Sequence, residues 1–209
     1  MLTMDRQHAE YQSTENAQRK YTHPLDYDWM KNFNSVSAVL DFGCGYGRLT
    51  PKLIDYGFST VVGYDISVPL IHQAFFENSE TSSNNELLQL TRSSFDLVIC
   101  FALFGSCPSV DDQLKLAAFI SNHTNPNAYL YISDYETVDN PNFKDLYEQR
   151  QLDTYGCFES SGKIFRHHEP GHFENLFFDW EKLKDRPLPS TNSNGGQITI
   201  HQYLFQKRN

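Results

Sequence analysis

The chain has 209 residues and a formal net charge of −9, with 17 lysine and arginine residues against 26 aspartate and glutamate residues. This length corresponds most simply to one domain with a sizeable core. The acidic balance argues against a broad nucleic-acid-binding surface, and no apolar run approaches the ~18–20 residues of a membrane span.

The cysteines and the start of the chain indicate the compartment. The four cysteines, Cys44, Cys100, Cys107 and Cys157, show no C-x-x-C spacing. We expect free thiols of a reducing compartment, with neither disulfides nor a metal site. The start of the chain is polar and charged and contains no signal-peptide core. The sequence therefore predicts a cytoplasmic protein with no membrane partner.

Residues 1–36 are predicted to form an N-terminal helical segment. Within it, Pro24 fixes its own backbone and restricts His23 to an extended conformation. A short helix is expected around Asp26 to Asn32. On the simplest interpretation, Pro24 and Leu25 begin this docking helix.

A glycine loop follows the first predicted strand. The apolar run Ser37 to Leu40 precedes three glycines at alternate positions, Gly43, Gly45 and Gly47. Glycine permits a tight turn and lets a ligand approach the main chain. A dinucleotide fingerprint needs glycine where Arg48 stands, and the Gly-Lys-Ser/Thr ending of a P-loop is absent. The loop thus predicts a nucleotide-type α/β unit of another kind.

The next elements continue an α/β pattern. A helix is predicted over Leu49 to Tyr56, and Gly57 ends it. The apolar strand Phe58 to Tyr64 ends at Asp65, 22 residues after Gly43. An acidic residue about 20 residues after such a glycine reaches a ribose diol. A helix to about residue 78 and a short edge strand over residues 86–90 are expected next.

The second half begins with a central strand over Phe95 to Phe104, apolar because both faces are buried. A helix is predicted over Val110 to His123, capped by Ser109. Its residues expected to face the sheet are Leu114, Ala117, Ala118, Phe119 and Ile120. A further strand is predicted over Ala128 to Asp134, and segments 180–187 and 197–206 should form a final antiparallel pair.

Taken in order, these motifs resemble the class I S-adenosylmethionine-dependent methyltransferases of the small-molecule type. The resemblance rests on Asp41 followed by G-x-G-x-G, on the strand ending at Asp65, and on strands 95–104 and 128–134. It covers residues 21–134. It implies an α/β fold with a Rossmann-like, seven-stranded, doubly wound sheet whose last strand is antiparallel, in one domain spanning residues 1–209.

The resemblance also implies S-adenosyl-L-methionine as the cofactor. It places the glycines beside the methionine part, Asp41 near the ammonium group and Asp65 on the ribose hydroxyls. Loop capping is the alternative for the two carboxylates. Adenine is expected to be held by backbone groups and by Leu88 or Leu90. The residues expected to bind the cofactor are Tyr21, Asp41, Gly43, Gly45, Gly47, Asp65, Ile66, Phe101 and Ala102.

A substrate cap is predicted over residues 140–168, after the fifth strand of the family pattern. Ligands of open α/β sheets bind beyond the carboxyl ends of the strands, and the cap leaves from that edge. It contains a hairpin whose second arm carries Arg166, His167 and His168. Because side chains alternate along a strand, either Arg166 and His168 or His167 alone should face the pocket.

The cap residues suggest roles in catalysis and substrate binding. We predict His167 or His168 as the base, with turnover rising through pH ~6–7 as the imidazole loses its proton. Arg166 could pair with an anionic group, and Tyr155 and His23 are further substrate-binding candidates. Exposed hairpin residues without a catalytic role are the alternative. No metal is expected.

The predicted function is methyl transfer to an O, N or S nucleophile of a small molecule by in-line displacement (EC 2.1.1.-). Aligning the reactants can supply most of the acceleration. The alternatives are a protein or nucleic-acid methyltransferase and a non-catalytic cofactor-binding subunit. Many nucleic-acid and protein enzymes carry Asn/Asp-Pro-Pro-Tyr/Phe after the fourth strand, where this chain has Cys-Phe-Ala-Leu-Phe. The expected partner is a small-molecule methyl acceptor, with no nucleic acid.

Overall fold

The structure is a computed structural model that describes residues 23–31, 33, 38–66, 95–139, 141–160, 162–191 and 195–209. The expected helix after Asp65, the expected strand at 86–90, and Tyr21, Leu88 and Leu90 lie outside these residues. Within the described ranges, no helix is long and apolar enough to cross a membrane. The main elements are α2 (Tyr27–Met30), β1 (Ala38–Phe42), α3 (Thr50–Tyr56), β2 (Thr60–Tyr64), β3 (Phe95–Phe101), α5 (Val110–His123), β4 (Thr124–Asp134), α6 (Pro141–Tyr147), β5 (Cys157–Ser160), β6 (Lys163–Arg166), α7 (His172–Leu176), β7 (Trp180–Thr191) and β8 (Gln197–Lys207).

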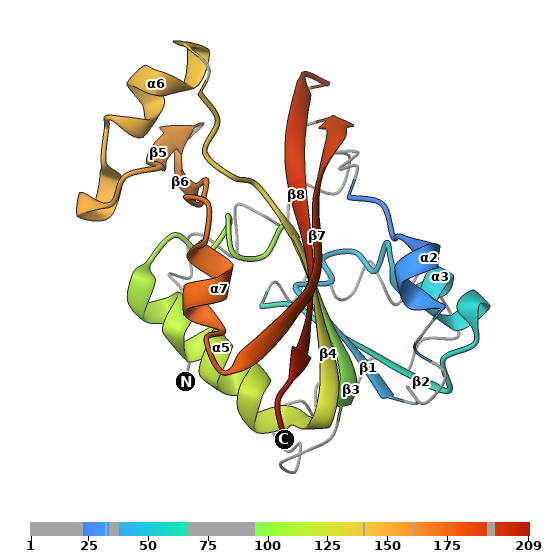
Figure 1. Cartoon of the computed structure of the whole chain (residues 1–209). Coiled ribbons are helices and arrows are strands. Elements are labelled where there is room, and N and C mark those ends of the chain that lie inside the picture. Colours follow the sequence, from blue (N-terminus) through green and yellow to red (C-terminus); the bar gives the residue numbers. More distant parts are fainter. Residues whose placement is uncertain are drawn as a thin grey trace.

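The central sheet of the described residues has six strands in the order β2-β1-β3-β4-β8-β7 (Figure 1). The pairs that link β2, β1, β3 and β4 are parallel. The last strand, β8, lies between β4 and β7 and is antiparallel to both. The prediction of an α/β sheet with an antiparallel last strand is therefore confirmed. The expected seventh strand falls at residues 86–90, which the structure does not describe.

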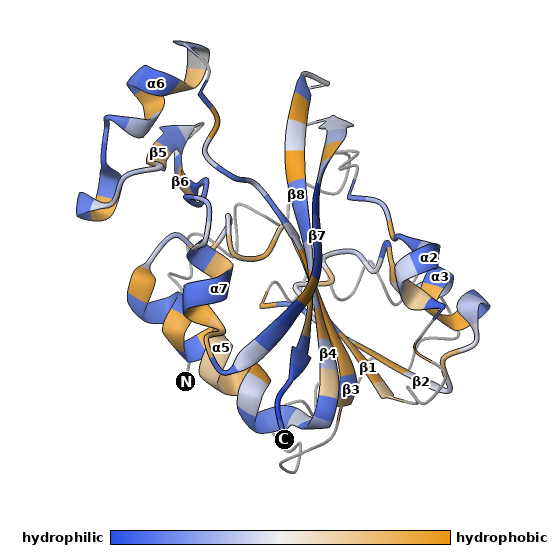
Figure 2. Ribbon diagram, viewed as in Figure 1, coloured by the Kyte–Doolittle hydropathy of each residue, from blue (hydrophilic) through white to orange (hydrophobic). Residues whose placement is uncertain are grey.

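Both faces of the parallel strands are covered, as their continuous apolar sequences predict. Leu40, Val98 and Leu130 face α5 and α7 within one cluster of buried residues, whereas Val39, Leu97 and Ile99 belong to a second cluster with α2 and α3 residues. Figure 1 shows these two pairs of helices on opposite sides of the sheet. In Figure 2 the central strands β1 and β3 are accordingly coloured mostly as hydrophobic, because their residues are largely buried. Those of the edge strand β2 are partly buried or exposed.

Helix α5 has the predicted bounds, and Ser109 caps it by accepting a hydrogen bond from the Asp112 amide. Its buried face was predicted in part. Ala117 and Ile120 are buried as expected, but Leu114 is 54% exposed, and Gln113 and Leu116 complete the buried face. These positions follow the helical period, which places a polar side chain on the apolar face.

The segment after β4 forms a small cap that has a two-stranded sheet of its own, β5 and β6. Figure 1 shows it beyond the carboxyl ends of β3 and β4, on the side of α5 and α7. Main-chain hydrogen bonds attach it there: the Arg166 amide donates to Gly105 O at 2.9 Å and the His168 amide donates to Tyr135 O at 2.9 Å. The cap is thus joined to the edge where ligands of such sheets bind.

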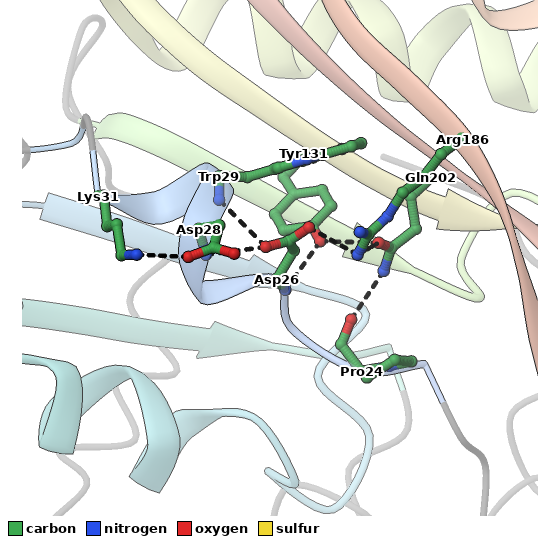
Figure 3. A network of polar contacts seen from close by, with 8 residues as sticks. All are labelled: Pro24, Asp26, Asp28, Trp29, Lys31, Tyr131, Arg186 and Gln202. Atoms are coloured by element: carbon green, nitrogen blue, oxygen red, sulfur yellow. Dashed lines mark hydrogen bonds and ion pairs between the residues drawn. The ribbon is translucent and has the colours of Figure 1, made fainter.

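Polar contacts join the segment around α2 to strands β4, β7 and β8 (Figure 3). Asp26 caps α2 by accepting from the Asp28 and Trp29 amides, and its other oxygen lies 2.6 Å from Arg186 Nη2 on β7. On β8, Gln202 Nε2 donates to Pro24 O at 2.7 Å. These contacts fix Pro24, and with it His23, against the C-terminal strands.

We predict that Asp26→Ala lowers the free energy of unfolding by about 1–2 kcal/mol, because it removes both a helix cap and the Arg186 contact. Urea denaturation measures the change. Asp28→Ala is the matched control, since it removes an exposed carboxylate from the same turn, and it should cause a much smaller loss. Equal losses in the two variants would show that the network does not hold the segment.

Candidate active site

The glycine loop leads from β1 to α3 and is hydrogen-bonded to the end of β2. Gly43, Gly45 and Gly47 have φ values of 82°, 56° and 79°, which favour glycine. The Gly43 amide donates to Tyr64 O at 2.7 Å, and the Gly45 amide donates to Asp65 Oδ2 at 2.9 Å. A Cβ added at Gly43 would lie 3.0 Å from Leu103 Cδ1, whereas one added at Gly45 would meet no described residue within 4 Å. The loop therefore packs closely at its start and has open space at its middle.

Asp41 is a buried carboxyl group beside this loop. It is only 2% exposed, and its Oδ2 atom has no hydrogen-bond partner among the described residues. Burial raises its pKa to about 7; the Arg48 guanidinium opposes this rise and the Asp65 carboxylate adds to it. A buried acceptor without a donor is costly. A cationic donor from a ligand, such as an ammonium group, would satisfy it.

The carboxyl ends of β3 and β4 form the next part of the site. Phe101 is buried and its ring lies edge-on to Tyr131, with 4.9 Å between centroids. Ala102 has a φ of 57°, uncommon for a residue with a side chain. Its amide donates to Ser133 O at 2.8 Å, which holds the turn. Strained backbone of this kind is often found at functional sites.

The structure brings His23 to the same edge. Its side chain is fully buried, with Nδ1 2.9 Å from Ser133 Oγ, and its Nε2 has no partner in the part of the chain that the structure describes. Its ring stands edge-on to Tyr135 at 5.3 Å, and Arg48 Nη1 donates to its carbonyl at 3.2 Å. Burial, aided by the Arg48 charge, lowers the pKa of His23 to about 3. The imidazole is therefore neutral at pH 7.

The structure argues against His168 as a catalytic base. His168 is fully buried, its Nε2 lies 3.0 Å from Gln113 Nε2, and its Nδ1 faces Tyr135 O at 3.3 Å. Burial holds its pKa well below the usual range. Both ring nitrogens thus have protein partners. This imidazole fastens the cap to α5, and a role for it as the base stays a prediction that these contacts do not favour.

His167 points to the opposite side, as strand alternation predicted, but into the cap's own aromatic core. Its Nδ1 lies 2.8 Å from the Tyr147 hydroxyl, and its ring stacks on Tyr135 at 5.1 Å between centroids. Phe158 meets it edge-on at 5.0 Å. Burial lowers the pKa of His167 to about 3. An activity change at pH 6–7 is therefore not expected from this residue either.

The remaining predicted substrate residues lie in the cap. Tyr155 is half-buried, and its ring centroid lies 5.7 Å from that of Tyr147. The Arg150 guanidinium lies over the Tyr155 ring, with its carbon 5.3 Å from the ring centroid. Arg166 is buried and faces α5 together with His168, since both contact Gln113. The predicted cofactor residue Ile66 follows Asp65 and is half-buried. For all three, the proposed ligand contacts stay predictions.

Two residues at this edge were not predicted. Gln113 links α5 to the Phe104 and Cys107 carbonyls and to His168, and Tyr135 lies between the rings of His23 and His167. A signal existed for Gln113, because it is the one polar residue among the apolar positions spaced +3, +4 and +7 along α5. Tyr135 directly follows the last residue of a buried strand, a position that faces the ligand edge.

The methyltransferase domain family matches residues 13–179, well over half of the chain. The chain belongs to this methyltransferase family. A solved S-adenosylmethionine-dependent methyltransferase from Methanosarcina mazei is 20% identical, with a TM-score of 0.79 over 88% of this chain and 98% of that chain. The N-methyltransferase NodS from Bradyrhizobium japonicum, solved with S-adenosyl-L-homocysteine, is 13% identical, with a TM-score of 0.60 over 83% of this chain and 79% of that chain. None of the curated proteins compared with the chain matches it.

The methyltransferase family and the fold it shares with these structures identify S-adenosylmethionine as the cofactor and methylation as the reaction. The site fits this cofactor. The unpartnered Asp41 oxygen suits its ammonium group, and the open space beside Gly45 suits a molecule that lies against the main chain.

The buried imidazoles predict how the stability of the methyltransferase depends on pH. Because burial lowers the pKa of His167 from 6.5 to about 3, its neutral form contributes stability above pH 6.5 that is lost as the pH falls toward 3. His167→Phe removes this dependence. The difference in unfolding free energy between wild type and His167→Phe should shrink by about 1.4 kcal/mol per unit between pH 6 and 5.

Urea denaturation at pH 7, 6 and 5 gives this difference. Asp41 and Asp134 have raised pKa values because they are buried, so they titrate with the opposite sign and only the comparison between variants is diagnostic. His201→Gln is the control. Burial lowers the pKa of His201, but hydrogen bonds and charge interactions with Glu136 and Asp185 outweigh burial, so its pKa in the folded protein is raised. The contribution of His201 to stability is therefore fully present below pH 6.5 and does not change between pH 6 and 5. A His167 difference independent of pH would contradict the assignment.

Proposed function

We propose that this methyltransferase transfers the methyl group of S-adenosylmethionine to an O, N or S nucleophile of a small molecule. One observation supports this above the others. An unpartnered buried carboxyl group, a glycine loop with open space beside it, and an unpartnered imidazole nitrogen occur at one edge of the sheet, and a cap lies beyond that edge. The edge thus offers contacts for a cofactor and, separately, for an acceptor.

The cofactor side is formed by residues at the ends of β1 and β2. In this proposal the glycine loop lies against the methionine part, Asp41 accepts from the ammonium group and Asp65 accepts from the ribose hydroxyls. The cofactor supplies a methyl carbon already activated by a sulfonium. The protein's contribution is then to hold and orient, which can provide most of the rate acceleration.

His23 is proposed as the residue on the acceptor side. Its Nδ1 contact with Ser133 fixes the ring, and its Nε2 has no protein partner. With a pKa of about 3, the imidazole is a weak base at neutral pH, so it serves best as a hydrogen-bonding group that positions the nucleophile. An acceptor whose nucleophilic atom is already deprotonated or uncharged at pH 7 suits this arrangement.

The size of the acceptor is inferred from charge and from the cap. The net charge of −9 does not suit a polyanionic substrate. The cap fills its own interior with aromatic side chains, including Tyr147 and Phe158, which are 1% and 6% exposed. Such a rigid cap beside the site favours a small acceptor over a protein or nucleic-acid strand.

We predict that Asp65→Asn weakens binding of S-adenosyl-L-homocysteine by roughly 10- to 100-fold, as expected for the loss of charge-assisted hydrogen bonds. Asparagine retains an oxygen that can accept from the Gly45 amide, so the loop geometry is preserved. Titration calorimetry measures the affinity. Asp41→Asn should have a smaller effect, and Asp55→Asn, an exposed carboxylate on α3, should have none. Unchanged affinity in Asp65→Asn would refute the ribose assignment.

Methyl transfer itself can be tested with methyl-labelled S-adenosylmethionine and three acceptor pools: a metabolite extract, total RNA with DNA, and a protein lysate. We expect label in the metabolite pool alone. Label in a macromolecular pool would overturn the small-molecule proposal. Cofactor binding without labelled product in any pool would instead indicate a non-catalytic cofactor-binding subunit.

A further inference from the structure

Arg166 is a buried cation without a counterion among the described residues. It is 8% exposed. Its Nη1 makes two long contacts, each of 3.4 Å, to the neutral oxygens Pro108 O and Gln113 Oε1, and its Nε has no partner. No carboxylate of the described chain lies within ion-pair distance of its guanidinium. A buried charge without a partner costs several kcal/mol.

The groups around Arg166 neutralise it only weakly. Burial lowers the pKa of the guanidinium by more than the charge of the exposed Glu169 raises it, and no ion pair joins the two. His168 and His172 are held neutral by burial, which lowers the pKa of His172 to about 4. Burial also raises the pKa of the Cys157 thiol, opposite Arg166 on β5, so it stays protonated. The nearest helix end is the N-terminus of α5, just after Pro108, and it carries partial positive charge. Asp112 in that first turn is paired with Lys115 at 2.8 Å.

The position of Arg166 relates it to the ligand edge. Its amide donates to Gly105 O at 2.9 Å, and a Cβ added at Gly105 would lie 3.1 Å from Arg166 O. Gly105 belongs to the turn that begins at Ala102, the strained residue at the carboxyl end of β3. The main chain of Arg166 therefore meets the turn that borders the proposed acceptor site, and its guanidinium lies at the end of that turn, with Nη1 3.4 Å from Pro108 O, just before α5.

We propose that Arg166 binds an oxyanion carried by the methyl acceptor, so that the substrate is an acidic small molecule. This inference rests on the proposed function. A guanidinium presents donors in a planar fork that matches the two oxygens of a carboxylate or a phosphate. The unpartnered Nε supplies one of the two donors that such a contact requires. Binding would provide the missing counterion and would fix the acceptor at the junction between cap and sheet.

The first experiment measures anion binding without turnover. Melting temperatures of the full chain are compared in sodium chloride, acetate and phosphate at equal ionic strength. An anion at ten times its dissociation constant should raise Tm by roughly 3–6 °C. Acetate and phosphate distinguish the two kinds of oxyanion. We expect the shift in wild type and in Arg150→Met, an exposed arginine of the same cap, but not in Arg166→Met.

The stability of Arg166→Met without added oxyanion tests the unpaired charge itself. Replacing a buried, uncompensated charge with an apolar side chain of similar length should leave Tm unchanged or raise it. A large fall in Tm would identify Arg166 as a structural anchor and overturn the proposal. Equal oxyanion shifts in wild type and Arg166→Met, or no shift in wild type, would overturn it as well.

The second experiment uses the labelled products of methyl transfer. We expect the labelled product to bind an anion exchanger. With the unmethylated precursor of that product as substrate, Arg166→Met should raise KM by roughly 10- to 100-fold with little change in kcat. The KM of Arg166→Lys should lie between those of the wild type and Arg166→Met. A neutral labelled product with unchanged KM in Arg166→Met would overturn the inference while leaving methyl transfer intact. Absence of any labelled product would count against the proposed function, and the melting experiment would still decide whether the anion site exists.

Discussion

The Asp134 carboxylate is the contact on which the ligand edge depends. It is fully buried at the end of β4 and accepts from the Gly105 amide at 3.0 Å and from the Tyr135 amide at 2.9 Å. These bonds tie the turn after β3 to the end of β4. The cap is attached to the same turn through Arg166. Burial raises the pKa of Asp134 to about 7 although the backbone amides oppose the rise. The strand ends, the turn and the cap thus share one polar centre.

Several polar side chains at this edge are buried, including Asp41, His23 and Arg166. Asp41, His23 and Arg166 each keep a buried atom without a hydrogen-bond partner. Native proteins leave few such atoms, and those that occur need an explanation. Among the described residues, three further atoms of this kind belong to Glu174, Arg186 and His201, whereas those of Asp41, His23 and Arg166 lie near the edge where α/β folds bind ligands. The atoms near this edge lower the stability of the folded chain, and hydrogen bonds from a cofactor and an acceptor would remove that loss.

The sequence predicted the parts of the fold that depend on local pattern. The α5 bounds, the glycine-ended α3 and the antiparallel pair β7 and β8 follow from caps, glycine positions and apolar runs. Burial of individual side chains was less predictable, because it depends on contacts between distant segments. Leu114 was placed on the wrong side of α5 for this reason, and the burial of Gln113 was not predicted. One of the two cap histidines was likewise expected to face the pocket. Their depth depends on Tyr147, Phe158 and Gln113, which no local pattern places beside them.

The contact between Gln202 and Pro24 joins residues separated by 178 positions. Since Pro24 is adjacent to His23, the acceptor side of the site is complete only when β8 is in place. A ribosome makes the chain from its N-terminus, and the glycine loop, the cap and α5 all emerge before that strand does. The proposed cofactor residues follow β1 and β2, which are made early, whereas the position of His23 depends on a strand that is made much later. The order of synthesis thus separates the two proposed halves of the site in time.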